Sequence, residues 1–225
     1  MLAFSAMTAY AVWNSDNQTA IVSLVLGTLG FLTALIIPRL TIYLVGFGWF
    51  LATMAVVPIT YYIHDTLQLQ LNPHIPSSGQ ERFPIWYEVA ERVQENPYWG
   101  HGVVSLQALV QSGRGFIGEH AHSHSVFLQT WYETGLVGSA ILLGVGLTIL
   151  GRLYRYPRTL ICYGVSTFVT LTFSLATTAW ELWVPWHLGI LALTGMVILL
   201  VNRIVMLENN KRCLGNLPVF GGDSA

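Results

Sequence analysis

Residues 119–138 read EHAHSHSVFLQTWYETGLVG. The first six positions hold a carboxylate and three histidines, and an apolar run of helical length begins at Val126. Groups that exchange protons therefore meet a hydrophobic segment within a few residues. Titratable groups at such a boundary are typical of a functional site at a membrane. We expect the rest of the chain to hold this stretch at a membrane surface.

The composition of the whole chain is that of an integral membrane protein. Of the 225 residues, 53% are hydrophobic and 9% are charged, and the mean hydropathy is +0.56. Soluble domains carry about 25% charged residues. A net charge of −1 offers no basic field, so no nucleic-acid partner is expected. Cys162 falls in an expected span and Cys213 in the terminal tail, so a disulfide scaffold is not expected, and the sequence has no CxxC pair or Cys/His zinc spacing.

The apolar runs predict an all-α, polytopic helical membrane protein with about five full spans and a partial first one. The full spans are expected at residues 19–37, 40–63, 126–150, 159–180 and 186–206, and the partial span at 1–12. Pro58 is expected to kink the second span near its end. The chain then divides into membrane spans at 1–63, an extracytoplasmic loop at 64–125, membrane spans at 126–206 and a cytoplasmic tail at 207–225.

Lysine and arginine in the short connections predict the orientation of these spans. Arg39 lies between the first two full spans, and three more follow the third full span: Arg152, Arg155 and Arg158. Another three lie at the end of the last span and in the tail: Arg203, Lys211 and Arg212. With the spans given above, all three places fall on one side, which the positive-inside rule assigns to the cytoplasm. The 64–125 loop then lies outside.

Within this loop, residues 80–96 predict an amphipathic helix. Its apolar face would hold Ile85, Trp86, Val89, Ala90 and Val93. Its polar face would carry an ion pair between Glu88 and Arg92, one helical turn apart. We expect such a helix to lie flat on the membrane.

The histidines are the first candidates for chemistry. We expect His124 near the start of a helix, where backbone N–H groups lack partners and the helix dipole favours anions. A neutral histidine at such a position can act as a general base. Two other interpretations stay open. The histidines could be solvent-exposed loop residues, or His120, His122 and His124 could bind zinc together with Glu119.

Arginines and carboxylates of the outer side are the next candidates. Arg82 precedes the amphipathic helix, and its planar guanidinium suits a phosphate, although it could equally reach toward a lipid headgroup. Arg114 lies among glycines and could also bind an anion. Glu133 lies near a membrane interface, where a functional role and a structural hydrogen-bonded role are comparable.

Several motifs are absent from the sequence. It contains no Asp-x-Asp pair, no phosphate-binding GxxxxGK[ST] and no GxSxG. Chemistry driven by nucleotides or by a metal bridging phosphates is therefore poorly supported. An extracytoplasmic reaction would need an activated, membrane-borne donor.

Four segments resemble the superfamily of O-antigen ligases and O-antigen polymerases, which are bacterial polytopic glycan transferases. They are RFPIW at 82–86, ENPYWGHG at 95–102, HSHSVFLQ at 122–129 and ETGLVG at 133–138, and NSDNQTA at 14–20 is similar to an earlier family motif. Ser125 stands where members commonly carry Asn, and Asn17 and Gln18 stand where an Arg is common. The resemblance covers only the later half of a typical member, so we expect the C-terminal part of a longer protein.

The resemblance implies a multi-pass enzyme of the bacterial inner membrane that serves lipopolysaccharide or other polysaccharide biosynthesis. It would transfer a polyprenyl-pyrophosphate-linked glycan to a sugar hydroxyl, on lipid A-core or on another lipid-linked glycan, without a cofactor or a metal. In such enzymes an outer-loop histidine activates the acceptor, and here it matches His124, flanked by His122. Arg82 matches the pyrophosphate-binding arginine, with Arg114 as a second candidate and Glu133 as a supporting group.

Two alternatives remain beside this interpretation. One is a metal-binding or transport module of the membrane that uses His120, His122 and His124. It predicts stoichiometric zinc or copper in the purified protein. The other is an inactive fragment of a glycan transferase.

Overall fold

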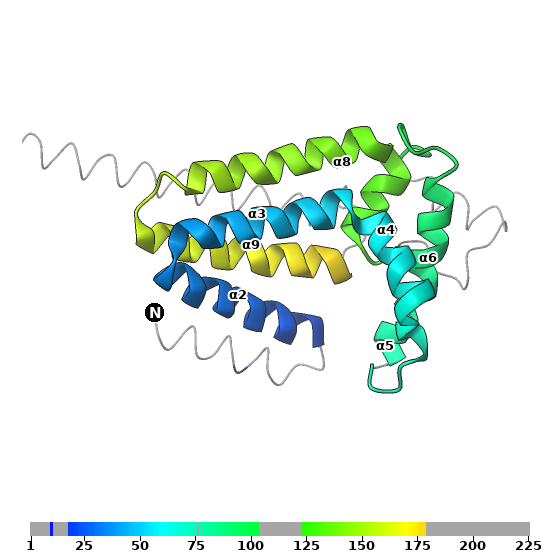
Figure 1. Cartoon of the computed structure of the whole chain (residues 1–225), viewed down its shortest axis with the longest axis horizontal. Helices are drawn as coiled ribbons and strands as arrows, with labels where there is room; N and C mark the ends of the chain where they lie inside the picture. The colour runs from blue at the N-terminus through cyan, green and yellow to red at the C-terminus, as the bar shows by residue number, and fades with distance from the viewer. Residues whose placement is uncertain (1–9, 11–17, 76, 104–122, 179–225) are drawn as a thin grey trace, which may run out of the picture. The chain divides into compact units, whose positions relative to one another are not determined.

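The computed structural model describes residue 10 and residues 18–75, 77–103 and 123–178 (Figure 1). This part of the chain is helical and contains no strand, as expected for the all-α class. Its elements are α2 (Gln18–Ile36), α3 (Pro38–Met54), α4 (Val56–Tyr61), the π-helix η1 (Tyr62–Leu67), the short 3-10 helix η2 (Leu69–Leu71), α5 (Ser77–Gln80), α6 (Arg82–Val93), α8 (Val126–Leu153) and α9 (Arg158–Thr178).

Three of these helices, α2, α8 and α9, are long and apolar enough to cross a membrane. The number rises to four if α3 and the bent segment after it form one span. The spans expected at 19–37, 126–150 and 159–180 therefore correspond to helices of the structure. The spans expected at 1–12 and 186–206 lie outside the described residues. The protein is a multi-pass membrane protein.

The span expected at 40–63 differs from the prediction. It is not a continuous helix with a kink at Pro58, because α3 ends at Met54 and the chain bends by 77° into the next segment. Proline has no N–H to donate to the carbonyl four residues earlier, so Pro58 leaves the Met54 carbonyl without its helical partner at the point where α3 ends. The neighbouring Thr53 carbonyl accepts a hydrogen bond from the indole of Trp131, at 2.7 Å.

Helices α2, α3, α8 and α9 share a buried cluster of apolar side chains. Its core residues are Ala34, Ile42, Leu150, Ile161, Cys162 and Val165. Small residues let α2 and α9 approach closely, as is common between membrane helices. A side chain at Gly27 of α2 would overlap Thr170 of α9, and the hydroxyls of Ser23 and Ser174 lie 3.0 Å apart.

A second cluster joins α6 to α4 and to the first turns of α8. Its buried residues are Ile85, Val89, Ala90, Val93, Leu128 and Tyr132, with Val56, Val57 and Tyr61 of α4 packed against them. The predicted apolar face of α6 is therefore confirmed, and so is the Glu88–Arg92 pair at 2.9 Å. The expectation that this face lies on lipid is wrong, because protein covers it. Burying each large side chain contributes about 1.5–3 kcal/mol, which fixes α6 against α8.

Two cationic turns lie together at one end of the helices: the turn from α2 into α3, which carries Arg39, and the turn from α8 into α9, which carries Arg155. The guanidinium of Arg39, in the first turn of α3, lies 5.6 Å from the ring centre of Tyr154, which follows the last residue of α8. The second cluster, which we call the α4–α6 cluster, lies at the opposite ends of α3 and α8 (Figure 1). The positively charged turns and the candidate site thus occupy opposite ends.

Candidate functional site

His124 lies two residues before α8 and is half-buried. Its φ is +53°, in the left-handed region, whereas Ser125 is extended at the helix N-cap. Among residues with a side chain, His is one of the few that adopt positive φ with some frequency. The expectation that His124 lies near a helix start is therefore confirmed, and the backbone there is strained. Such strain persists only where neighbouring contacts enforce it.

Those contacts involve the residues on both sides of His124. The indole of Trp86 donates to the Ser123 carbonyl at 2.8 Å, and the Ser123 hydroxyl donates to the Ser125 carbonyl at 2.8 Å. The backbone N–H of Gln129 also donates to the Ser125 carbonyl, at 2.9 Å. Ser123 and Ser125 are buried. Helix α6 and the first turn of α8 therefore fix the turn that carries His124.

Glu133 lies two turns into α8 and is 3% exposed. Its Oε1 accepts a hydrogen bond from Nε2 of Gln129 at 2.8 Å. Oε1 of Gln129 in turn accepts from the backbone N–H of Ser123 at 3.3 Å. A chain of hydrogen bonds thus runs from Glu133 through Gln129 to the residue preceding His124.

Arg82 is the first residue of α6 and is half-buried. Its Nη1 donates to the carbonyl of Thr177, in the last turn of α9, at 2.6 Å. Trp86 lies four residues further on and therefore shares a face of α6 with Arg82. Trp86 donates to the Ser123 carbonyl, so Arg82 lies one helical turn from the residue of α6 that contacts the His124 turn.

The other predicted site residues cannot be placed in the same way. His122 and Arg114 lie outside the described residues, as do His120 and Glu119 of the alternative zinc site. Within the described ranges, no three His, Cys, Asp or Glu side chains are grouped so that they could hold a metal ion.

Helix α8 is interrupted at Gly135, whose φ of 61° and ψ of −155° are not helical. In a continuous helix the N–H groups of Leu136 and Val137 would donate to the carbonyls of Tyr132 and Glu133. Here they donate to carbonyls of the 97–102 loop, at 2.8 and 3.3 Å. The carbonyls of Tyr132 and Glu133 accept N–H groups of the same loop, at 2.8 and 2.9 Å. The loop therefore inserts into α8 directly after Glu133.

Two glycines make this insertion possible. A Cβ at Gly135 would lie 2.5 Å from the carbonyl carbon of Tyr98, and a Cβ at Gly100 would overlap the backbone of Glu133. Both residues also have positive φ, at 61° and 69°. The segments 95–102 and 133–138, which the sequence analysis considered separately, thus form one crossing of two backbones.

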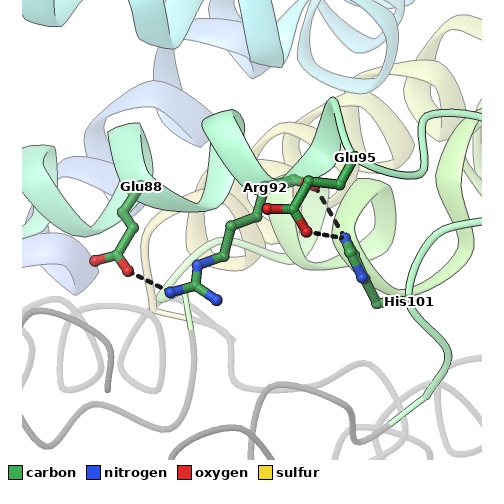
Figure 2. Close-up of polar contacts among 4 residues, drawn as sticks. All are labelled: Glu88, Arg92, Glu95 and His101. Atoms are coloured by element: carbon green, nitrogen blue, oxygen red, sulfur yellow. Dashed lines mark hydrogen bonds and ion pairs between the residues drawn. The ribbon is translucent and has the colours of Figure 1, made fainter. Parts of the chain in front are cut away.

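His101 anchors this loop to α6 (Figure 2). Its Nε2 lies 2.9 Å from the carbonyl oxygen of Arg92, which can only accept, so Nε2 carries the proton. The ring stacks on Tyr132, with centroids 4.6 Å apart. The same close-up shows Glu95 3.9 Å from His101 and the ion pair of Arg92 with Glu88. These contacts give His101 a structural role.

The phenol of Tyr87 is a further titratable group, and it lies where η1 meets α6. His64 bonds Asp65 at 2.9 Å and stacks on Tyr87, with ring centroids 3.9 Å apart. Partial burial, followed by the carboxylates of Asp65 and Glu91, raises the pKa of the Tyr87 phenol above its usual value.

The structure brings three further residues to the candidate site that were not predicted as site residues: Trp86, Ser123 and Gln129. Trp86 was assigned to the apolar face of α6, but its indole N–H serves the His124 turn. Gln129 could have been found, because it lies one helical turn before Glu133 in an otherwise apolar run. Ser123 contributes mainly its backbone, which leaves no signal in residue type.

Comparison with known proteins identifies the family of the chain. The profile of the O-antigen ligase family matches residues 3–143, which is more than half of the chain. The matched segment includes Arg82, His124, Glu133 and the Gly135 crossing. No curated protein and no solved structure shows a significant match. By the extent of the profile match, the chain belongs to the O-antigen ligase family.

Proposed function

We propose that this protein transfers a polyprenyl-pyrophosphate-linked glycan to a sugar hydroxyl at the outer face of the bacterial inner membrane. The acceptor is either lipid A-core or another lipid-linked glycan, so the product is lipopolysaccharide or a related polysaccharide. The observation that supports the proposal is the strained His124 turn, which Trp86 of α6 contacts one helical turn from Arg82. Family membership supports the reaction class.

In this mechanism the acceptor hydroxyl attacks the anomeric carbon of the donor sugar. A ring nitrogen of His124 takes the hydroxyl proton as the new C–O bond forms. The bond between the anomeric carbon and the pyrophosphate oxygen breaks, and its electron pair leaves with the polyprenyl pyrophosphate. Pyrophosphate is a good leaving group, so a base and a cation at the departing charge are sufficient.

Arg82 supplies that cation. A guanidinium has five N–H donors in a planar fork that fits two phosphate oxygens. The Thr177 carbonyl takes one of them, which fixes the side chain at the end of α9. We assign Arg114 to the donor pyrophosphate as well, and His122 to the support of His124.

Glu133 supports the site from within the protein. Its burial and its hydrogen bond from Gln129 keep the carboxylate away from bulk water. We place it as a supporting group of the His124 turn and not as the group that accepts the proton. The 64–125 segment, which carries Arg82 and His122, is the extracytoplasmic loop in this proposal.

The test is His124→Asn. Asparagine tolerates positive φ, so the turn is retained, but an amide cannot accept the proton. We expect glycan transfer in membranes that carry the full chain to fall about 100-fold or more. The control is His74→Asn, at an exposed position of the 72–75 turn, which should transfer at the wild-type rate. Undiminished transfer by the His124 variant would refute the mechanism.

A further inference from the structure

Gln129 is buried at 2% exposure and joins two polar groups from different parts of the site. Its Nε2 donates to the Glu133 carboxylate at 2.8 Å, and its Oε1 accepts from the Ser123 N–H at 3.3 Å. A backbone N–H can only donate, so the amide oxygen must face Ser123. The amide nitrogen then faces the carboxylate. The two partners together define one orientation of the side chain.

A carboxamide is the side chain that this position requires. Glutamate would face the buried Glu133 with a second carboxylate, and like charges at close range disfavour ionisation of both. An apolar residue would leave the Ser123 N–H and the Glu133 oxygen without this partner, and buried polar groups are costly to leave unbonded. The chemistry of Gln129 is thus matched to both neighbours.

Gln129 also contacts both residues that flank His124. Its side chain binds the N–H of Ser123, and its main-chain N–H donates to the Ser125 carbonyl. The hydroxyl of Ser123 closes the turn on Ser125 at 2.8 Å. His124 lies between these residues with φ of +53°, a conformation that the surroundings must enforce.

We propose that Gln129 is a positioning residue for His124. It connects the buried carboxylate of Glu133 to the turn and keeps the imidazole in the orientation that accepts the hydroxyl proton. The proposal rests on the proposed function of His124. Trp86 holds the same turn from α6 through its indole N–H. Two variants on different helices can therefore disturb the turn independently.

The kinetic test compares Gln129→Met with Thr130→Val. Methionine keeps the volume of glutamine but loses both hydrogen bonds. Thr130 is the next residue, and its hydroxyl donates to the Val126 carbonyl, which lies outside this network. We expect Gln129→Met to lower kcat about 10- to 100-fold, as a small misplacement of a reacting group does, with KM for the lipid-linked donor changed less than about threefold. Thr130→Val should leave both constants at wild-type values.

A second readout follows His124 itself and does not depend on glycan transfer. Diethyl pyrocarbonate modifies neutral imidazole, and peptide mass spectrometry measures its rate at His124 alone. We expect Gln129→Met and the milder Trp86→Phe each to raise this rate severalfold, because His124 is half-buried when its turn is intact. If one variant fails to fold in the membrane, the other still tests the proposal.

The outcomes separate the two proposals. If His124→Asn abolishes transfer but Gln129→Met and Trp86→Phe match Thr130→Val in both readouts, the positioning role is wrong and the proposed function stands. If His124→Asn transfers normally, the proposed function fails. The modification rate at His124 then still decides whether Gln129 fixes the turn.

Discussion

At the scale of single residues, Arg82 and Arg92 show how one residue type serves two purposes on the same helix. Arg92 forms an ion pair with Glu88 one turn away, as the sequence predicted. Arg82 instead donates to the main-chain carbonyl of Thr177, 95 positions further along the chain. A carbonyl partner leaves the positive charge of Arg82 uncompensated by that contact, which favours an anionic ligand.

Replacing Arg82 by lysine tests this difference. Lysine keeps the charge but cannot hold two phosphate oxygens in a planar fork. We expect KM for the polyprenyl-pyrophosphate donor to rise about tenfold, in line with the loss of one charge-assisted hydrogen bond. Steady-state kinetics in reconstituted membranes would measure it. Arg92→Lys is the matched control and should change KM little. An equal effect of both variants would contradict the assignment of Arg82.

At the scale of elements, the interruption of α8 is the feature that builds the site. The helix gives up two intrahelical hydrogen bonds at Gly135 and gains four to the 97–102 loop. The segment from Val126 to Thr134 is thereby separated from the rest of α8. This segment carries Gln129 and Glu133. Its Leu128 and Tyr132 pack against the apolar face of α6.

Gly135→Ala should destabilise this arrangement. The backbone angles at Gly135 belong to a region that only glycine adopts at low cost, so strain alone costs about 1–3 kcal/mol. The new Cβ would also displace Tyr98. We expect the unfolding temperature in detergent, followed by tryptophan fluorescence, to fall by about 2–4 °C per kcal/mol. Gly144→Ala, in the same helix with no atom within 4 Å of the added Cβ, should not lower it. Equal temperatures for both variants would show that α8 can pass Gly135 unbroken.

At the scale of the whole molecule, positive charge and candidate chemistry lie at opposite ends of the described helices. The contact of Arg39 with Tyr154 places two cationic turns together. The α4–α6 cluster and the His124 turn lie at the other end of α8. If the cationic end is cytoplasmic, the candidate site lies at the extracytoplasmic side.

Labelling of single cysteines tests this orientation. In a chain with Cys162→Ala and Cys213→Ser, Glu91→Cys lies on the exposed side of α6, and Tyr156→Cys lies in the α8–α9 turn. A membrane-impermeant maleimide applied to spheroplasts should label the first and spare the second until the membrane is opened. The reverse pattern would invert the orientation.

The sequence predicted what depends on periodicity and local chemistry. The helices at 19–37, 126–150 and 159–180 and the Glu88–Arg92 pair follow from apolar runs and helical spacing. The break at Gly135 could not be predicted in this way, because the apolar run continues through it and its partner loop lies some thirty residues earlier. The bend was expected at Pro58 but lies after Met54. The offset arises because the missing N–H of a proline removes the partner of the carbonyl four residues before it.

Contacts between segments that are distant in the sequence could not be predicted for the candidate site either. His124, Arg82 and Glu133 were selected by residue type, which states what a side chain can do. The role of Gln129 depends on partners at Ser123 and Glu133 that only a folded turn brings within reach. One of the two hydrogen bonds of the Gln129 amide goes to the main-chain N–H of Ser123, a group that every residue except proline has.

The crossing at Gly135 also constrains how such a chain can change in length. Between His124 and Gly135, each inserted or deleted residue would turn all that follows by about 100° and shift it by about 1.5 Å. The loop would then meet the wrong carbonyls. A change before Gln129 would separate its amide from Ser123, and a change between Gln129 and Glu133 would break their hydrogen bond. The number of residues from His124 to Gly135 is thereby fixed, whereas the hydrogen bonds of α8 to the loop end at Val137.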